Sequence, residues 1–293
     1  MRVLVTGATG FVGRRLVPAL VEAGHDVTAL VRDAARYDPP PDVRVAVGDL
    51  LEPGTFEDAL TGVDAAYYLV HSMQAGEDFA ERDRRAAHNF AAAASARGVE
   101  RVIYLGGLGE ERDHLSHHLR SRREVEYVLA QGDYDLTTLR AAIVVGAGSS
   151  SFEMVRQIAA RLPVMVTPRW VRTRCQPIAI DDVIAYLVGV LDVPETAGET
   201  YEIGGPDVLT YEEVVRRTAR VLHGTEPLVV SVPVLSPRLS AYWIDLVTDV
   251  PKSVAHPLIL GLKNPVVVTD HRIESLVPVE RTPFDEAVRR ALA

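Results

Sequence analysis

The sequence has 293 residues, of which 47% are hydrophobic and 24% charged, a globular balance with room for one domain plus a smaller lobe. Its net charge of -9 argues against sequence-independent binding to nucleic acid, which depends on a basic surface. The single cysteine, Cys175, excludes an internal disulfide, and a reducing cytoplasm is the expected compartment. No signal peptide is visible before the first apolar segment, and the longest apolar stretch, residues 183–191, is too short to cross a bilayer.

The N-terminal stretch combines a short buried strand over residues 2–5, three glycines, and a helix over residues 11–23. Glycine is needed where the chain turns with positive φ or where the main chain approaches a ligand closely, and Gly7, Gly10 and Gly13 are placed for both. The helix that follows points its N–H groups and the positive end of its dipole at the loop. This arrangement predicts a site for the pyrophosphate of a dinucleotide.

A second strand over residues 26–31 ends at Arg32 and Asp33. At this place an acidic residue binds the 2′-hydroxyl of NAD, whereas arginine suits the 2′-phosphate of NADP. Arg32 and Arg36 can hold a phosphate in bidentate fashion, so NADP(H) is favoured over NAD(H). Asp33 as the ribose ligand and two solvated arginines are the alternatives.

Strand and helix patterns then alternate along the chain. Strands are expected over residues 43–47, 64–70, 101–105, 136–139 and 199–203, and helices over 55–60, 78–97, 116–129 and 151–160. The alternation predicts an α/β fold, a Rossmann-type doubly wound parallel sheet that binds its ligand at the carboxyl ends of the strands. We expect a Rossmann domain over residues 1–145 and a smaller C-terminal lobe over 146–293, interleaved with the sheet at about 176–205.

The C-terminal half carries fewer clear signals. Residues 176–180 are interpreted as a short strand, and Asp181 and Asp182 as the N-cap of the next helix rather than a carboxylate dyad. Thr210, followed three residues later by Glu213, predicts a capping box at the start of a further helix.

An arginine-rich segment lies between these elements. Arg172 and Arg174 alternate and would share one face of an extended chain, with Arg169 close by. These three side chains could clamp an anionic substrate, line the phosphate channel, or remain surface charge. The histidines within residues 114–118 lack the spacing of a helical zinc site, so no metal is expected.

The chain resembles the extended, atypical short-chain dehydrogenase/reductases, in the NAD(P)H-binding, NmrA-like group. Residues 6–13 match the TGxxGxxG loop of that superfamily, and residues 48–50 match its adenine-binding Asp-Leu pair. Asn89 lies in the helix where the family often has asparagine. Residues 176–183 and 201–206 match segments of its C-terminal part.

The resemblance extends to about residue 222 and implies a cofactor site along the glycine-rich loop and the strand ends. The residues expected there are Thr6, Gly7, Thr9, Gly10, Phe11, Val12, Gly13, Arg32, Arg36, Asp49, Leu50, Val70, His71, Ser72, Gly106 and Ala142.

The chain departs from the family at the proton donor. Active members use a Ser or Thr at the end of the fifth strand and a Tyr-x-x-x-Lys on the next helix, whereas this chain has Gly106 and Gly107, then His118 and Arg122. An imidazole can act as acid or base near neutral pH. Arginine can hold ribose or phosphate but cannot give up its proton. A solvated helix face is an equally good interpretation of this segment.

The sequence therefore predicts an NAD(P)(H)-dependent oxidoreductase acting on a small molecule of the carbonyl or quinone type. A redox sensor that binds NADPH and signals to a regulatory protein partner is the alternative, and an assembly subunit that keeps the nucleotide for stability is another. Fold alone does not choose among them. A monomer or homodimer, without nucleic acid or a membrane span, is expected.

Overall fold

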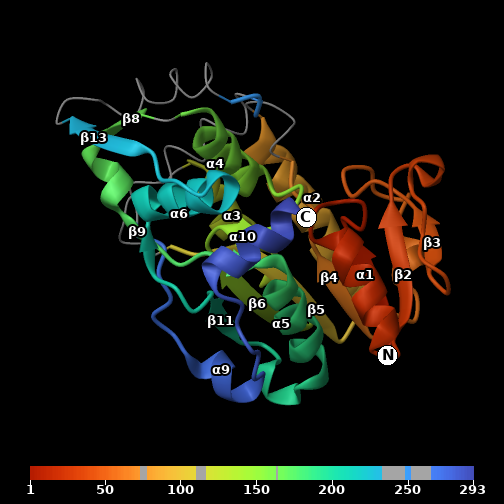
Figure 1. The fold of residues 1–293 in the computed structure, drawn as a ribbon. Helices are drawn as coiled ribbons and strands as arrows, with labels where there is room; N and C mark the ends of the chain where they lie inside the picture. The colour runs from red at the N-terminus through yellow and green to blue at the C-terminus, as the bar shows by residue number, and fades with distance from the viewer. Residues whose placement is uncertain (73–77, 110–116, 163, 233–247, 252–264) are drawn as a thin grey trace.

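The computed structural model describes residues 1–72, 78–109, 117–162, 164–232, 248–251 and 265–293 (Figure 1). For residues 117, 118, 166, 168–170, 231 and 232 the description is confined to the main chain.

A parallel sheet of seven strands forms the centre of the molecule, and its strand order is β11-β6-β5-β4-β1-β2-β3. The strands are β1 (Arg2–Thr6), β2 (Asp26–Val31), β3 (Arg44–Val47), β4 (Ala65–Tyr68), β5 (Arg101–Gly107), β6 (Asp135–Ala141) and β11 (Thr200–Ile203). The order reverses between β1 and β4, which makes the carboxyl ends of these two strands the switch point where such sheets bind ligands. The predicted doubly wound α/β fold is confirmed.

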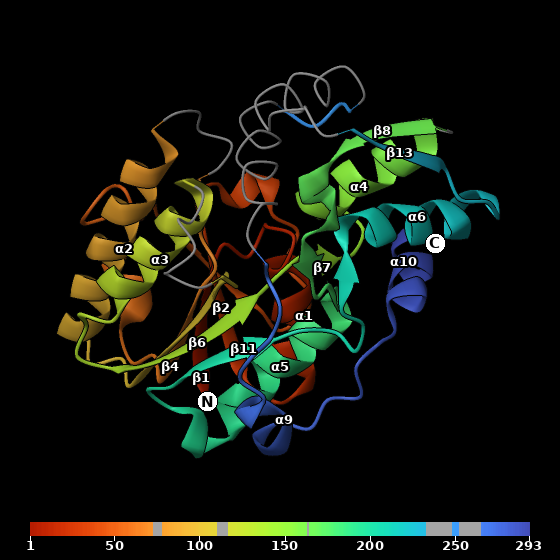
Figure 2. The same ribbon diagram turned by 90° about the vertical axis from the view of Figure 1, so that its left-hand side faces the viewer.

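Side chains alternate across this sheet and divide its core into two layers. Helices α1 (Gly13–Glu22) and α5 (Ile180–Asp192) cover one face of the sheet, and α2 (Phe79–Ala96) and α3 (His117–Leu129) cover the other (Figure 2). On β1, Val3 and Val5 pack with the first pair of helices and Leu4 with the second. The period of two that puts successive side chains on opposite faces is the reason for this division. The central strands β1, β4 and β5 are buried on both faces because helices cover both, whereas the edge strand β3 is largely exposed.

A second hydrophobic core lies beyond the sheet. It gathers residues of α4 (Ser150–Arg161), α6 (Tyr211–His223) and α10 (Phe284–Leu292) around the fully buried Cys175. Burial raises the pKa of the Cys175 thiol to about 12. Three pairs of short strands border this core: β7 (Val144–Val145) with β10 (Ile178–Ala179), β9 (Arg174–Cys175) with β12 (Leu209–Thr210), and β8 (Val164–Pro168) with β13 (Leu228–Val232).

Two local predictions for this half need correction. Of the strand expected over residues 176–180, only residues 178–179 form a strand, β10, which pairs with β7. Asp181 and Asp182 are not the N-cap of α5, because the helix begins at Ile180 and both aspartates lie in its first turn. The capping box at the start of α6 is confirmed.

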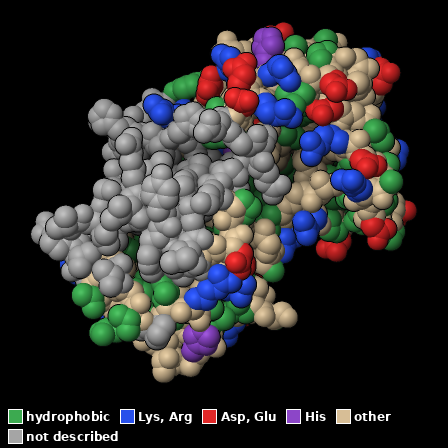
Figure 3. Space-filling view, turned by 90° about the horizontal axis from the view of Figure 1, so that it is seen from above, with side chains coloured by type: hydrophobic (Ala, Val, Ile, Leu, Met, Phe, Trp, Pro, Cys, Tyr) green, Lys and Arg blue, Asp and Glu red, His purple; other side chains and the backbone are tan. Residues whose placement is uncertain are grey.

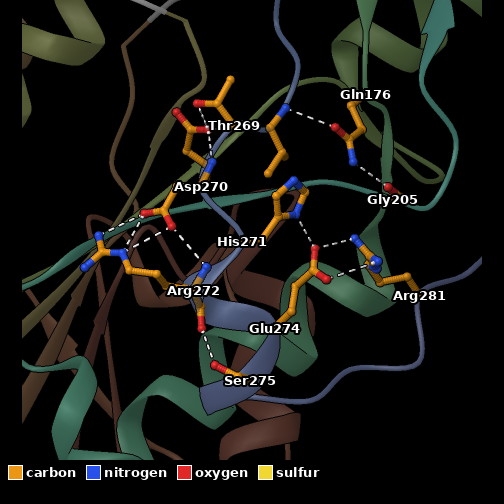
Figure 4. Close-up of polar contacts among 11 residues, drawn as sticks. Gln176, Gly205, Thr269, Asp270, His271, Arg272, Glu274, Ser275 and Arg281 are labelled. Atoms are coloured by element: carbon orange, nitrogen blue, oxygen red, sulfur yellow. Dashed lines mark hydrogen bonds and ion pairs between the residues drawn. The ribbon is translucent and has the colours of Figure 1, made fainter.

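The C-terminal segment is bound to the sheet through polar contacts around α9 (Arg272–Leu276), as Figure 4 shows. Glu202 on β11 accepts hydrogen bonds from the main-chain N–H and the hydroxyl of Thr269 at 2.6 and 3.0 Å. Buried Asp182 accepts two more, both 2.8 Å long, from the N–H and hydroxyl of Thr282. These bonds fix the approach of α10 to the second core.

Short 3-10 helices complete the described structure: η1 (Ala34–Arg36), η2 (Glu57–Leu60), η5 (Arg169–Arg172) and η6 (Pro194–Thr196). The helix expected over residues 55–60 is therefore the single turn η2.

Candidate active site at the carboxyl edge of the sheet

The glycine-rich loop joins β1 to α1 in a turn that larger residues cannot form. Gly7 has a φ of +69°, and a Cβ atom there would lie 2.8 Å from the carbonyl oxygen of Leu69. A Cβ atom at Gly13 would lie 2.3 Å from the carbonyl oxygen of Gly7. Gly10 donates its N–H to that same oxygen at 2.9 Å. The first and third glycines thus allow the tight turn and the close packing of α1 against the loop.

The N-terminus of α1 faces this loop with unpaired donors. Its N-cap residue, Val12, provides no side-chain hydrogen bond. The main-chain N–H groups of Phe11 and Val12 have no hydrogen-bond partner among the described residues. Unpaired N–H groups and the helix dipole together form an anion site.

Thr6 and Thr9, also expected at the cofactor, differ in setting. The Thr6 hydroxyl is buried, donates to the carbonyl of Tyr67 at 3.0 Å and accepts from the N–H of Leu69 at 3.2 Å. This side chain therefore joins the ends of β1 and β4. Thr9 is exposed at the loop, and its carbonyl accepts a hydrogen bond from Arg14.

The carboxyl end of β2 presents the residues predicted to choose between cofactors. The Asp33 carboxylate caps η1 by accepting from the N–H of Ala35 at 3.0 Å, and it pairs with Arg36 at 3.3 Å. Arg36 is 87% exposed. Arg32 is also exposed, and no ion pair joins its guanidinium to a described residue.

Asp49 and Leu50 follow β3 and turn the chain toward η2. The Asp49 carboxylate accepts from the N–H of Leu51 at 2.9 Å, while the Leu50 side chain is buried in the core beside α2. Asn89 on α2 donates its side-chain amide to the carbonyl of Leu50 at 2.8 Å. The asparagine singled out by the resemblance thus positions the loop expected to contact adenine.

His71 and Ser72, just after β4 and Val70, are both bonded to Asp83 on α2. The Nδ1 atom of His71 lies 2.7 Å from Oδ2 of Asp83, and the N–H of Ser72 donates to Oδ1 at 2.7 Å. Asp83 has no exposed side-chain surface. This aspartate is not among the residues predicted from the sequence, although its place on the apolar face of a helix, four residues after Phe79 and three before Ala86, is a recognisable signal.

The protonation states of this pair follow from its surroundings. Burial and the positive charge of Arg122 lower the pKa of His71, and the hydrogen bond to Asp83 opposes them in part. Burial alone would raise the pKa of Asp83, but hydrogen bonds from His71 and Ser72 hold it below its ordinary value. Asp83 is therefore a carboxylate and accepts the hydrogen of His71 Nδ1.

The end of β5 carries no Ser or Thr hydroxyl, and α3, which packs beside it, carries Arg122. Gly106 and Gly107 end the strand, and a Cβ atom at Gly107 would lie 2.9 Å from the Leu119 side chain. Arg122 is 9% exposed, stacks 5.0 Å from the ring centre of Tyr104 and donates Nη2 to the carbonyl of Leu105 at 2.9 Å. Its Nη1 atom is buried and has no hydrogen-bond partner within the described part of the chain.

Two further residues predicted from the sequence, His118 and Ala142, lie near the ends of the strands. His118 lies in the first turn of α3, but its side chain is outside the described residues. Ala142 follows β6 and packs against the second core. Arg15, which was not predicted, joins the two sides of the site by donating to the carbonyls of Phe11 and Ala147, each at 2.8 Å.

The arginine-rich segment does not have the extended form that the sequence predicted. Arg172 ends η5 and Arg174 begins β9, so the two do not share one face of an extended segment. Both are exposed, and Arg172 lies 3.7 Å from Glu212. The side chain of Arg169 is outside the description.

Figure 3 shows the molecule from the side at which the strands end, and several basic side chains lie near one another on the described part of this face. Both lysines of the chain, Lys252 and Lys263, fall outside the described residues, so these basic side chains are arginines. In the described residues no three His, Cys, Asp or Glu side chains group as metal ligands would. Among the described helices, none is both long and apolar enough to cross a membrane.

Comparison with known proteins agrees with this geometry. Residues 7–159 match the sequence profile of an NAD(P)H-binding family. The chain is 30% identical to the ceramide reductase of Caulobacter vibrioides over 240 residues, 79% of this chain and 73% of that protein. It is 29% identical over 224 residues to a mitochondrial NADH dehydrogenase subunit of Arabidopsis thaliana, the alpha subcomplex subunit 9, covering 72% of this chain and 55% of that one.

Solved structures show the same fold across the chain. The Escherichia coli quinone oxidoreductase QOR2, solved with NADPH, superposes with a TM-score of 0.78 at 21% identity, covering 99% of this chain and 100% of that one. The Citrobacter triphenylmethane reductase, solved with NADP(H), gives a TM-score of 0.77 at 20% identity with the same coverage. The chain belongs to the NAD(P)H-binding family of the atypical, NmrA-like short-chain dehydrogenase/reductases.

Proposed function

We propose that the protein is an NADP(H)-dependent oxidoreductase that reduces a carbonyl or quinone group of a small molecule. One observation supports this most directly: the anion site at the start of α1 and the His71–Asp83 pair lie at the same switch point, where β1 and β4 end. A dinucleotide held by the first would extend along the edge that carries the second. The ceramide reductase of Caulobacter vibrioides and other relatives named as reductases favour this reaction class.

The chain's own residues fit such a cofactor. The N–H groups of Phe11 and Val12 would bind the pyrophosphate, and the absence of a side chain at Gly10 leaves room for it. Asp49 and Leu50 would border the adenine. When bound, NADPH would supply the hydride.

The preference for NADP(H) is supported by the groups that follow β2. Asp33 directs its carboxylate into the cap of η1 and to Arg36, while Arg32 is exposed beside it. A carboxylate already accepting two donors is a poorer acceptor for a ribose hydroxyl, whereas an exposed guanidinium suits the 2′-phosphate.

On the substrate side, Arg122 would hold the nicotinamide ribose or a phosphate, and Arg169, Arg172 and Arg174 would bind an anionic group of the substrate. His118 is the proton donor that the family spacing predicts.

A test mixes the purified protein with NADPH and a panel of aldehydes and quinones and follows absorbance at the nicotinamide band. Turnover with any of them supports the oxidoreductase, and tight binding with no turnover contradicts it.

A non-catalytic NADPH sensor or assembly subunit is the second candidate. The observation in its favour is that β5 ends in Gly106 and Gly107 and so lacks the hydroxyl of active members. A relative named as a subunit of mitochondrial NADH dehydrogenase agrees with such a role. Affinity capture with and without NADPH tests it, since a sensor should release or bind a protein partner according to the nucleotide.

A further inference from the structure

The His71–Asp83 pair has the form of an acid–base unit. Asp83 is an ionised carboxylate without exposed surface, and it receives the hydrogen of His71 Nδ1 at 2.7 Å. This bond makes Nε2 the ring nitrogen that gains and loses the titrating proton. The ring centres of Phe79 and His71 lie 6.3 Å apart, with the two rings edge to face.

The second component is Arg122, which approaches the pair from α3. Its guanidinium lies over the ring of Tyr104 and donates a hydrogen bond to the carbonyl of Leu105, so its position is fixed from two sides. The buried Nη1 atom lacks a described partner, and a buried donor without a partner costs free energy that a bound oxygen would recover. Asp83 from α2 and Arg122 from α3 are the charged groups of the described chain that act on His71.

We propose that His71, positioned by Asp83, is the proton donor of this enzyme, and that Arg122 holds the nicotinamide ribose beside it. This inference rests on the proposed function and replaces His118 in the role that the family spacing suggests. A bound NADPH would supply the hydride for the new C–H bond as the C=O π bond breaks. The proton on Nε2 of His71 would form the O–H bond, leaving an alcohol, the oxidised nucleotide and a neutral imidazole that water reprotonates. In the reverse direction neutral His71 takes the proton from the alcohol.

A nuclear magnetic resonance titration tests the location of His71 without any substrate. The histidine ring signals are followed against pH with NADPH and with NADP+, and His71 is identified from the signal missing in His71→Gln. The oxidised nicotinamide carries an extra positive charge, so the His71 pKa should be lower with NADP+ than with NADPH. An equal pKa in the two complexes overturns the inference, and failure of both nucleotides to bind overturns the proposed function instead.

His25 provides a matched control for that measurement. Burial lowers the pKa of His25 as well, and an aspartate, Asp192, lies 3.6 Å away. His25, however, comes just before β2, at the amino ends of the strands and so on the side of the sheet away from His71. Its pKa should be the same with either nucleotide.

The kinetic test uses 4-nitrobenzaldehyde as the carbonyl probe. His71→Gln should lower kcat by about 10²–10⁴, the usual contribution of a general acid, and leave the NADPH Kd unchanged. His25→Gln should keep the wild-type rate. Imidazole added to His71→Ala should restore part of the rate, because the site of His71 is partly open to solvent. If His118→Gln loses the rate and His71→Gln retains it, the inference is wrong.

The positioning role of Asp83 has its own readout. The hydrogen bond and negative charge of Asp83 raise the pKa of His71 relative to burial alone. Asp83→Asn should therefore move the pH at which the reduction rate falls to a lower value. A lower rate with an unmoved pH profile would assign Asp83 a structural role only.

Discussion

A Cβ atom added to Gly13 would lie 2.3 Å from the carbonyl oxygen of Gly7, which is far inside van der Waals contact. The first turn of α1 therefore rests directly on the main chain of the loop. This contact brings the N–H groups of Phe11 and Val12 to the floor of the anion site. The third glycine of the motif has a packing role, whereas the second, Gly10, is exposed and borders the ligand.

Gly10→Asp should abolish dinucleotide binding in a protein that remains folded. The new carboxylate would add both volume and negative charge beside the pyrophosphate, where the main chain must come close. Gly10→Ala is the matched control, because its Cβ atom would lie 3.1 Å from the carbonyl of Gly7 and would add no charge. Titration of NADPH by fluorescence measures both variants. Wild-type affinity in Gly10→Asp would contradict the site assigned to this loop.

Arg32→Ala should remove most of a preference for NADPH over NADH. One charge-assisted hydrogen bond to the 2′-phosphate contributes about 1.5–3 kcal/mol. That free energy corresponds to roughly a ten- to hundredfold preference in Kd. Arg36→Ala should have a smaller effect, since Arg36 already pairs with Asp33. If the wild-type protein binds NADH more tightly, Asp33 reads the ribose and the assignment to Arg32 is wrong.

The fold and the dinucleotide loop were predictable because their signals are local. The glycines at 7, 10 and 13 lie within one short segment between a buried strand and a helix, and the alternation of strands and helices determines the parallel sheet. The strand expected over 176–180 was too long for the opposite reason. The length of β10 is set by its pairing with β7, a partner far away in the sequence that the local pattern does not contain.

The contacts of His71 and Arg122 at the strand ends were also not predictable, because they too join residues that are separated in the sequence. His71 was predicted as a cofactor contact from its position after β4, but its partner Asp83 lies on the next helix, across residues that carry no pattern for the pairing. Arg122 was predicted from family spacing alone. Its stacking on Tyr104 and its bond to Leu105 arise from the packing of α3 on β5, which depends on Gly107.

Asp182→Ala should lower the free energy of unfolding, whereas Asp181→Ala should not. Asp182 is buried and accepts two hydrogen bonds from Thr282, and losing bonds to a charged acceptor costs about 1.5–3 kcal/mol. Asp181 is exposed and meets Arg290 only at 3.4 Å, so its removal should stay within about 0.5 kcal/mol. Urea denaturation distinguishes the two. Equal losses would mean that the contact to Thr282 does not hold the C-terminal segment.

His25→Gln should make stability less dependent on pH on the acid side of neutrality. Burial lowers the pKa of His25 in the folded protein, so below the ordinary histidine pKa of about 6.5 the unfolded chain binds the proton first. The stabilisation is complete above that pH and is lost as the pH falls toward the folded-state pKa. Urea midpoints across this range should fall less steeply in the variant than in the wild type. His88→Gln, a change at an exposed position on α2, should leave the wild-type slope.

Arg122→Ala should weaken NADPH binding by roughly ten- to a hundredfold, the effect of losing one hydrogen bond to a charged group. The buried Nη1 atom of Arg122 is the donor without a described partner, and it lies on the edge where the nicotinamide half of the cofactor would be. Arg122→Lys should recover only part of the affinity, because an ammonium cannot donate to Leu105 and to a ligand in the fixed geometry of a guanidinium.

Arg101→Ala is the control for Arg122→Ala. Arg101 is also buried, but it lies at the start of β5, far from the loop, and donates to Thr137. It should lower the thermal midpoint and leave the affinity of the folded protein unchanged, as calorimetry and NADPH titration would show. If Arg101→Ala and Arg122→Ala lose affinity alike, the effect at Arg122 comes from destabilisation and the residue does not contact the cofactor or substrate.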